Sequence, residues 1–173
     1  ALAFSNQFAL SAARRNKFLM QEQLARRGVA SIKQRLTADC DELQRWLASH
    51  DRWPVVLKPV QSAGTDGVFI CHDLAQAIQA FDAILAKHDL FGSANREVLC
   101  QEFLAGEEFV VNGIACQGEY FFTELWQSKK QQRNGFPVYE TQYLHYRNDA
   151  GFDVLTDYTA QVCQALGIEN GAF

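Results

Sequence analysis

The chain has 173 residues, 48% of them hydrophobic and 21% charged, a balance that favours a globular fold with a sizeable buried core. Its formal net charge of −4 argues against a nucleic-acid partner, because nucleic acids bind basic surfaces. No apolar run reaches the roughly 20 residues that cross a bilayer, so we expect no membrane association. The cysteines are widely spaced and form no CxxC pair, which favours reduced thiols and a cytoplasmic protein.

The spacing of apolar residues predicts helices and short strands in alternation over the first half of the chain. The expected elements are a helix over residues 11–28, a strand over 29–32, a helix over 38–50 and strands over 55–57 and 68–71. We expect the last two strands to form a hairpin-like unit around the loop between them. Asp73 is the expected N-cap of a further helix. The apolar residues at helical spacing on this helix are Leu74, Ile78, Phe81 and Leu85.

Strands dominate the expected structure of the second half. The expected elements are strands over residues 97–103, 108–116, 119–127 and 139–146, a loop over 128–136 and a helix over 154–166 that Gly167 caps. Gln117 and Gly118 predict a tight turn between two of these strands. Because neighbouring strands are expected to be antiparallel, the pattern predicts an α+β fold. We place a small lobe at residues 1–90 and a larger, mostly antiparallel sheet lobe at residues 91–173.

The loop over residues 58–67 carries the clearest chemical signal. Lys58 ends an apolar strand, and the small residues Ser62, Gly64, Thr65 and Gly67 follow it. Small residues let backbone N–H groups approach an anion closely, and a neighbouring lysine adds a positive charge. A nucleotide triphosphate needs such a site, although the loop matches neither the Walker A pattern nor GxGxxG. By itself, a loop of this kind is more often a plain hairpin turn.

Four elements in chain order resemble the ATP-grasp family. They are RRNK at 14–17, PVVLKP at 54–59 followed by SAGTDGV at 62–68, VLCQEFLAGEEF at 98–109, and ALGIENGA at 165–172. The similarity is greatest to the carboxylate–amine ligases, which include the bacterial L-amino-acid (dipeptide) ligases. Biotin carboxylase and carbamoyl-phosphate synthase are more distant relatives. The resemblance implies an ATP-grasp fold, with the small phosphate-loop lobe at 1–90 and the first part of the large lobe at 91–173.

The resemblance implies an ATP site. Lys17 and Lys58 would contact the phosphates, and the loop would fold over them. Gln101 would accept a hydrogen bond from the adenine amino group, and Glu108 would accept from the ribose hydroxyls. Backbone groups of the residues after Gln101 would face the adenine edge. The residues implied to bind ATP are Lys17, Lys58, Ser62, Ala63, Gly64, Thr65, Gly67, Gln101, Glu102, Phe103, Leu104 and Glu108. Lys129 and Lys130 are expected to be a solvated pair of charges rather than a phosphate site.

The resemblance also implies an activity. ATP would phosphorylate a small-molecule carboxylate, and an amine would attack the acyl phosphate to form an amide. We expect a fragment that is truncated at both ends and stops before the metal-binding glutamates of the family. Mg²⁺ is therefore expected only in the full-length protein, and no metal ligand or catalytic residue is assigned.

Three alternatives to this function stay open. One is a non-catalytic ATP-binding or regulatory module of the same fold, and another is an enzyme of the biotin carboxylase or carbamoyl-phosphate synthase type. The third is a plain α+β scaffold that binds no nucleotide. The sequence does not identify the carboxylate or the amine, and it leaves the oligomeric state open, with a homodimer as one alternative.

Overall fold

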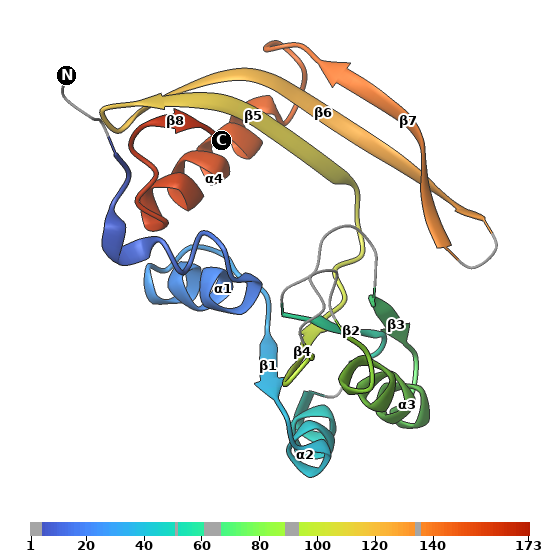
Figure 1. The fold of residues 1–173 in the computed structure, drawn as a ribbon. Helices are drawn as coiled ribbons and strands as arrows, with labels where there is room; N and C mark the ends of the chain where they lie inside the picture. The colour runs from blue at the N-terminus through green and yellow to red at the C-terminus, as the bar shows by residue number, and fades with distance from the viewer. Residues whose placement is uncertain (1–4, 51, 61–66, 89–93, 134–135) are drawn as a thin grey trace. The chain divides into compact units, whose positions relative to one another are not determined.

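The computed structural model describes residues 5–50, 52–60, 67–88, 94–133 and 136–173 (Figure 1). The chain divides into two compact units. Unit 1 comprises residues 1–12, 23–29 and 105–173, and unit 2 comprises residues 13–22 and 30–104. The boundary that we predicted between residues 90 and 91 lies inside unit 2, and the assignment of ATP-grasp lobes stays a proposal. Helices and two antiparallel sheets confirm the predicted α+β class.

Unit 2 is built on a four-stranded antiparallel sheet with the strand order β1-β4-β2-β3. Its strands are β1 (Gln34–Thr37), β2 (Val55–Pro59), β3 (Phe69–Cys71) and β4 (Val98–Glu102), and its helices are α2 (Cys40–His50) and α3 (Leu74–Leu85). The predicted hairpin-like unit is confirmed, because β2 pairs with β3. The two helices pack on the sheet face that carries Val55, Leu57 and Cys100, and these side chains form the core of the unit.

Helix α3 begins where the sequence predicts. The Asp73 side chain accepts a hydrogen bond from the Gln76 backbone N–H at 2.8 Å, which satisfies one of the free donors at the helix start. The predicted apolar face is right for Phe81, which is buried, and for Leu85, which packs against the core, but it is wrong for Leu74, which is 41% exposed. Besides Phe81, the buried residues of the helix are Ala77, Ala80 and Ile84, which the prediction did not include. Two alanines on this face let the helix approach the sheet closely. Because alanine is small, a search for large apolar residues at helical spacing does not detect it.

Two predicted elements before residue 38 are wrong in position. The helix spans α1 (Lys17–Arg26) rather than 11–28, because the Asn16 side chain accepts from the N–H groups of Phe18 and Leu19 at 2.9 and 3.0 Å and caps it. A short 3₁₀ helix, η1 (Phe8–Leu10), precedes it. The strand falls at β1 rather than at 29–32, because residues 34–37 pair with β4.

Unit 1 carries a second antiparallel sheet with the order β7-β6-β5-β8, on which helix α4 packs. Its elements are β5 (Glu108–Cys116), β6 (Glu119–Arg133), β7 (Phe136–His145), α4 (Phe152–Ala165) and β8 (Gly171–Ala172). The tight turn between β5 and β6 is confirmed, with φ angles of 53° at Gln117 and 81° at Gly118. The loop predicted over 128–136 is wrong, because β6 continues to Arg133 and pairs with β7.

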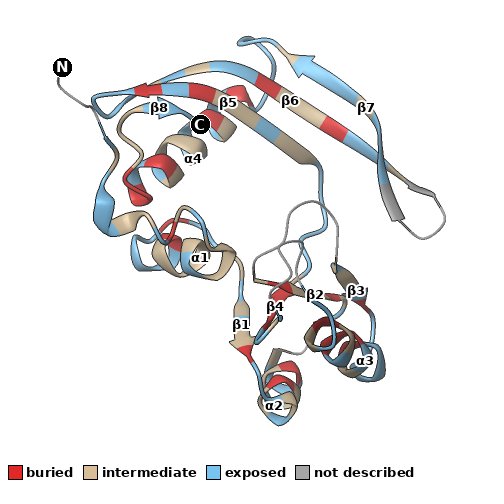
Figure 2. Ribbon diagram, in the orientation of Figure 1, coloured by how far each residue is buried: buried red, intermediate tan, exposed pale blue. Residues whose placement is uncertain are grey.

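Several buried residues of unit 1 lie on α4 and on the strands β5 and β6 that it packs against (Figure 2). Ala115 of β5, Leu125 of β6 and Cys163 of α4 are each 2–3% exposed. The segment after α4 is tied down by the N-terminal segment: the Asn6 side chain accepts from the N–H groups of Glu169 and Asn170 at 2.7 and 2.8 Å. These bonds hold the chain in place as it enters β8.

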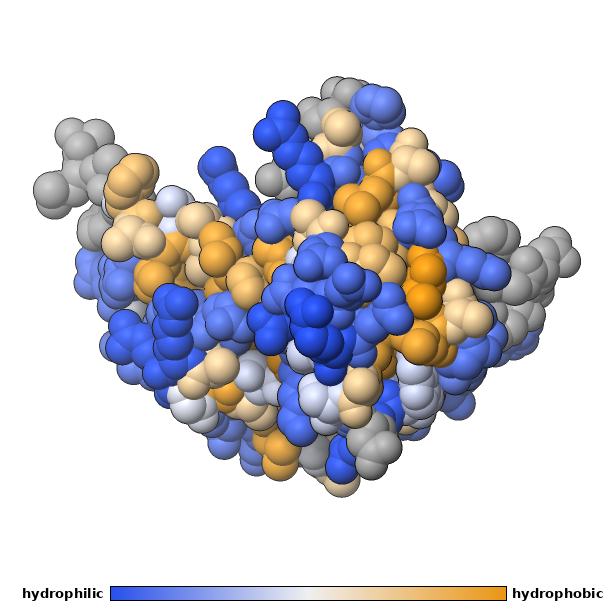
Figure 3. All heavy atoms as spheres, turned by 90° about the horizontal axis from the view of Figure 1, so that it is seen from below, coloured by the Kyte–Doolittle hydropathy of each residue, from blue (hydrophilic) through white to orange (hydrophobic). Residues whose placement is uncertain are grey.

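The surface is mixed in polarity. Figure 3 shows hydrophobic residues in separate patches among hydrophilic ones on the face that it displays. Among the described residues, no helix is long and apolar enough to cross a membrane.

Candidate functional site

The face of the unit 2 sheet that lies opposite α2 and α3 carries the predicted lysine and glutamine. Residues of β2 alternate between the two faces, so Lys58 lies on the opposite side from the buried Leu57. Val56 pairs with Gln101 and Lys58 pairs with Leu99. Since paired residues of adjacent strands project to the same side, Lys58 and Gln101 share this face. We call it the open face of unit 2.

Two positive charges lie close together in this unit. Burial lowers the pKa of Lys58 below its ordinary value, and the nearby charge of Lys17 lowers it further. Burial also lowers the pKa of Lys17. Among the described residues, no carboxylate forms an ion pair with Lys58. Two lysines that repel each other while partly buried favour the binding of an anion, because an anion offsets both the repulsion and the desolvation.

The position of Lys17 strengthens this tendency. It is the first residue of α1, directly after the Asn16 cap, and no acidic residue occurs in the first turn. The start of a helix has a positive dipole end, where carboxylates are the usual stabilising residues. A lysine there adds a second positive charge, and no acidic side chain in the first turn offsets it. The start of α1 therefore attracts an anion.

Gln101 is held in a buried network of amides. It is 3% exposed, and its Nε2 donates to Gln34 Oε1 at 2.9 Å across the β1–β4 pair. Gln34 in turn donates from its Nε2 to the Phe18 carbonyl at 2.9 Å and to Glu22 Oε1 at 3.1 Å. Because Gln34 engages the amide nitrogen of Gln101, the carbonyl oxygen of Gln101 is the atom that can accept from a ligand.

The residues after Gln101 differ in their free hydrogen-bonding groups. Glu102 is engaged with Lys33, since its backbone N–H donates to the Lys33 carbonyl at 3.0 Å and its Oε1 accepts from the Lys33 N–H at 2.8 Å. Phe103 and Leu104 are 39% and 68% exposed. Within the described ranges, no backbone hydrogen bond is found for either residue. Their N–H and C=O groups can therefore meet the edge of a bound base.

The predicted phosphate loop is described only at its end. Ser62, Ala63, Gly64 and Thr65 lie outside the described residues. Gly67 has a φ of +70°, and a Cβ atom there would lie 3.0 Å from Pro59 Cγ. Both the left-handed backbone and the close approach to Pro59 favour glycine, so Gly67 fixes how the chain returns toward β3.

Glu108, the last predicted site residue, lies in unit 1 and is bound by two donors. Lys130 Nζ lies 2.6 Å from Glu108 Oε2, and the Tyr139 hydroxyl donates to Glu108 Oε1 at 2.9 Å. Burial favours the neutral acid, but these two hydrogen bonds and the charge of Lys130 together hold the pKa of Glu108 below its ordinary value. The expectation of a solvated pair is wrong for Lys130, which makes this ion pair. Lys129 instead lies 5.1 Å from the ring centroid of Tyr143.

Comparison with known proteins identifies the family. Residues 15–135 match the family described as "Phosphoribosylglycinamide synthetase, ATP-grasp (A) domain". The chain belongs to the ATP-grasp family. The resemblance seen in the sequence motifs is thereby confirmed, and the match includes every predicted site residue.

One curated protein is similar to the chain in sequence, and solved structures are similar to it in fold. Dapdiamide A synthase of Enterobacter agglomerans is 84% identical over 172 residues, which are 99% of this chain and 41% of that protein. The chain thus spans less than half the length of this relative. The structure of an L-amino acid ligase from Bacillus licheniformis has a TM-score of 0.73 at 16% identity, over 98% of this chain and 38% of that one. A D-alanine–D-alanine ligase from Bacillus anthracis, complexed with ATP, has a TM-score of 0.64 at 14% identity, over 95% of this chain and 52% of that one.

Two partners of the candidate site residues were not predicted from the sequence. Gln34 was overlooked because the strand was expected at 29–32, and Tyr139 because its contact with Glu108 joins strands far apart in sequence. The only signal for Gln34 was a polar residue within a short alternating segment. Among the described residues, no group of three or more His, Cys, Asp or Glu side chains is placed to hold a metal ion.

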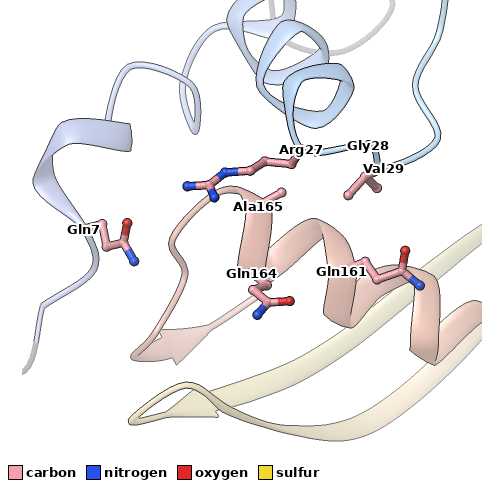
Figure 4. A pocket seen from close by; sticks show the side chains of 7 residues that line it. All are labelled: Gln7, Arg27, Gly28, Val29, Gln161, Gln164 and Ala165. Carbon is pink, nitrogen blue, oxygen red and sulfur yellow. The ribbon is translucent and has the colours of Figure 1, made fainter.

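A cavity of about 460 Å³ in unit 1 also had no sequence signal (Figure 4). The residues that line it are Gln7, Arg27, Gly28, Val29, Gln161, Gln164 and Ala165. Figure 4 shows the Arg27 guanidinium extending toward Gln7, above the end of α4. The cavity is distinct from the open face of unit 2, because its lining residues belong to unit 1.

Proposed function

We propose that the chain is the ATP-binding part of a ligase that joins a small-molecule carboxylate to an amine. The observation that carries the ATP site is the partly buried pair of Lys17 and Lys58 in the unit that also holds the buried Gln101. The 84% identity to a protein named dapdiamide A synthase supports the ligase activity. We further assign residues 1–90 to the small ATP-grasp lobe and 91–173 to the first part of the large lobe.

Each chemical part of ATP finds a matching group in the chain. The phosphates are negative, and we assign them to Lys17 and Lys58. The adenine amino group is a donor, and we assign it to the carbonyl oxygen of Gln101. The backbone of Leu104 offers a donor and an acceptor for the ring edge. The ribose hydroxyls are assigned to the Glu108 carboxylate.

The proposed reaction has two steps. The γ-phosphoryl group passes to the substrate carboxylate, and the amine then attacks the acyl phosphate, which yields an amide, ADP and phosphate. The chain contributes positioning and neutralisation of charge, since Lys17 and Lys58 offset the negative charge of the phosphates. Mg²⁺ would supply further charge neutralisation, and we assign its binding to the full-length protein. A cytoplasmic location and a homodimer stay predictions.

Titration of the full-length protein with ATP and Mg²⁺ by calorimetry tests the nucleotide site. We expect the Lys58→Ala variant to bind at least about 10-fold more weakly, because a charge-assisted hydrogen bond contributes about 1.5–3 kcal/mol. Lys87→Ala is the matched control, since Lys87 is an exposed lysine of the same unit. Equal affinity in the two variants would remove the phosphate assignment.

Phosphate release against a panel of amino acids tests the reaction. We expect release only when both a carboxylate and an amine acceptor are present. Tight ATP binding without release in any combination would favour the non-catalytic ATP-binding module instead.

A further inference from the structure

Three side chains from neighbouring strands close a triangle on the sheet of unit 1. Glu108 comes from β5, Lys130 from β6 and Tyr139 from β7. Besides the two contacts to the carboxylate, Lys130 Nζ lies 4.6 Å from the ring centroid of Tyr139. Lys130 and Tyr139 are direct partners in the strand pairing, so the backbone holds these two side chains together. The triangle therefore fixes the carboxylate from two sides.

The triangle is open to solvent and keeps free acceptor capacity. The side chain of Glu108 is 42% exposed, that of Lys130 is 32% exposed, and Tyr139 is 57% exposed. Each oxygen of a carboxylate has two lone-pair sites, and each oxygen of Glu108 receives one donor here. One further hydrogen bond can reach each oxygen without displacing Lys130 or Tyr139. Two adjacent hydroxyls of a cis-diol supply such a pair of donors.

We propose that Lys130 and Tyr139 are positioning residues that hold the Glu108 carboxylate for the ribose cis-diol, and that they make the site select ribonucleotides over deoxyribonucleotides. This inference rests on the proposed function, which assigns the ribose to Glu108. A free glutamate side chain on a strand samples several rotamers, and ordering it on binding costs affinity. The triangle removes that cost before the nucleotide arrives, because Lys130 holds one carboxylate oxygen and Tyr139 holds the other.

The same two strands offer a matched control. Lys129 lies over the ring of Tyr143, also on β6 and β7, at 5.1 Å from the ring centroid. This pair has the same residue types and the same kind of contact, and no contact with Glu108 is found for it in the described part of the chain. Changes at Lys129 and Tyr143 therefore report general effects on the sheet.

Competition titrations of the full-length protein with ATP, 2′-deoxy-ATP and 3′-deoxy-ATP test the proposal. We expect the unmutated protein to prefer ATP by about 10-fold or more over each deoxynucleotide, since each hydroxyl bonds to a charged acceptor. Tyr139→Phe and Lys130→Met should reduce this preference to about threefold or less, because the carboxylate is then free to turn. Tyr143→Phe and Lys129→Met should leave the preference unchanged.

The outcomes separate the two levels of the proposal. If the unmutated protein binds no ATP, the proposed function is overturned. If ATP binds and Glu108→Gln leaves the preference intact, the ribose assignment is wrong. If Glu108→Gln removes the preference and the variants of Lys130 and Tyr139 behave like their controls, the positioning role is overturned while the nucleotide site stands. A preference lost only in the Lys130, Tyr139 and Glu108 variants supports the inference.

Discussion

Replacing Gln101 with glutamate perturbs the buried amide network at a single atom. At present Gln101 Nε2 donates to Gln34 Oε1 at 2.9 Å, and the substitution puts a second acceptor in that place. Gln34 cannot turn its own amide to compensate, because its Nε2 already donates to the Phe18 carbonyl and to Glu22. The Gln101→Glu variant therefore leaves buried acceptors facing each other, which costs about 1–3 kcal/mol. For a chain of this size, that corresponds to a fall in Tm of about 2–12 °C.

The cost should depend on pH with a defined sign. Burial at a site that is 3% exposed raises the pKa of the introduced carboxyl above its value in the unfolded chain. The protonated acid can donate to Gln34 Oε1, so the variant is closest to the unmutated protein at low pH. Its stability falls as the pH rises from the unfolded pKa through the raised folded pKa.

Thermal unfolding at pH 5 and pH 7.5 measures both effects. Gln101→Met is the control, because it has a similar size and no charge and should lose the same stability at both pH values. Unfolding of Gln101→Glu at the temperature of the unmutated protein at pH 7.5, or an equal loss of stability at both pH values, would refute this prediction.

Three further predictions concern the lysine pair and the sheet of unit 1. Gly113→Ala should lower the free energy of unfolding by about 1–3 kcal/mol, because the added Cβ would lie 2.4 Å from Phe173 Cζ and 2.6 Å from the Phe121 carbonyl oxygen; an unchanged urea midpoint would contradict this. Asn6→Ala should cost about 1–3 kcal/mol in the same assay, because it leaves the N–H groups of Glu169 and Asn170 without their acceptor, whereas no loss would mean that the N-terminal segment does not hold the turn. Lys58→Met should stabilise the nucleotide-free protein at neutral pH, because it removes a partly buried charge. In the unmutated protein, stability should rise with pH between the lowered folded pKa of Lys58 and its unfolded pKa, because the unfolded chain binds more protons there. The Lys58→Met variant should lack this rise. A rise that persists in Lys58→Met would show that other groups cause it.

Local signals in the sequence predicted the parts of the fold that depend on local chemistry. Asp73 caps α3, the turn at Gln117 and Gly118 joins β5 to β6, and β5 has its predicted bounds. Each of these features arises from residues within a few positions of one another. A capping side chain, a pair of turn residues and an alternating strand act over such distances.

The errors arose where distant pairing decides the structure. The end of β6 contains Lys129 and Lys130, a polar run that is typical of a loop, and it forms a strand because β7 pairs with it. The strand before α2 falls at Gln34 rather than Val29 for the same reason, since β4 is its partner.

In the candidate site too, features that depend on local sequence could be predicted, whereas features that depend on the pairing of distant strands could not. Strand alternation places Lys58 opposite the buried Leu57, so its place on the open face of unit 2 could be predicted from the sequence. The contact of Gln101 with Gln34 depends on the register of two strands separated by more than sixty residues, and no local pattern encodes that register. The ATP-grasp motifs identify the candidate site residues, whereas the fold determines the physical partners of those residues.

A crystal structure of the full-length protein with a non-hydrolysable ATP analogue tests the central claim most directly. We expect phosphate oxygens within hydrogen-bonding distance of the Nζ atoms of Lys17 and Lys58. We also expect the adenine amino group at the carbonyl oxygen of Gln101. A nucleotide bound away from these lysines, or an adenine ring that does not reach Gln101, would contradict this claim.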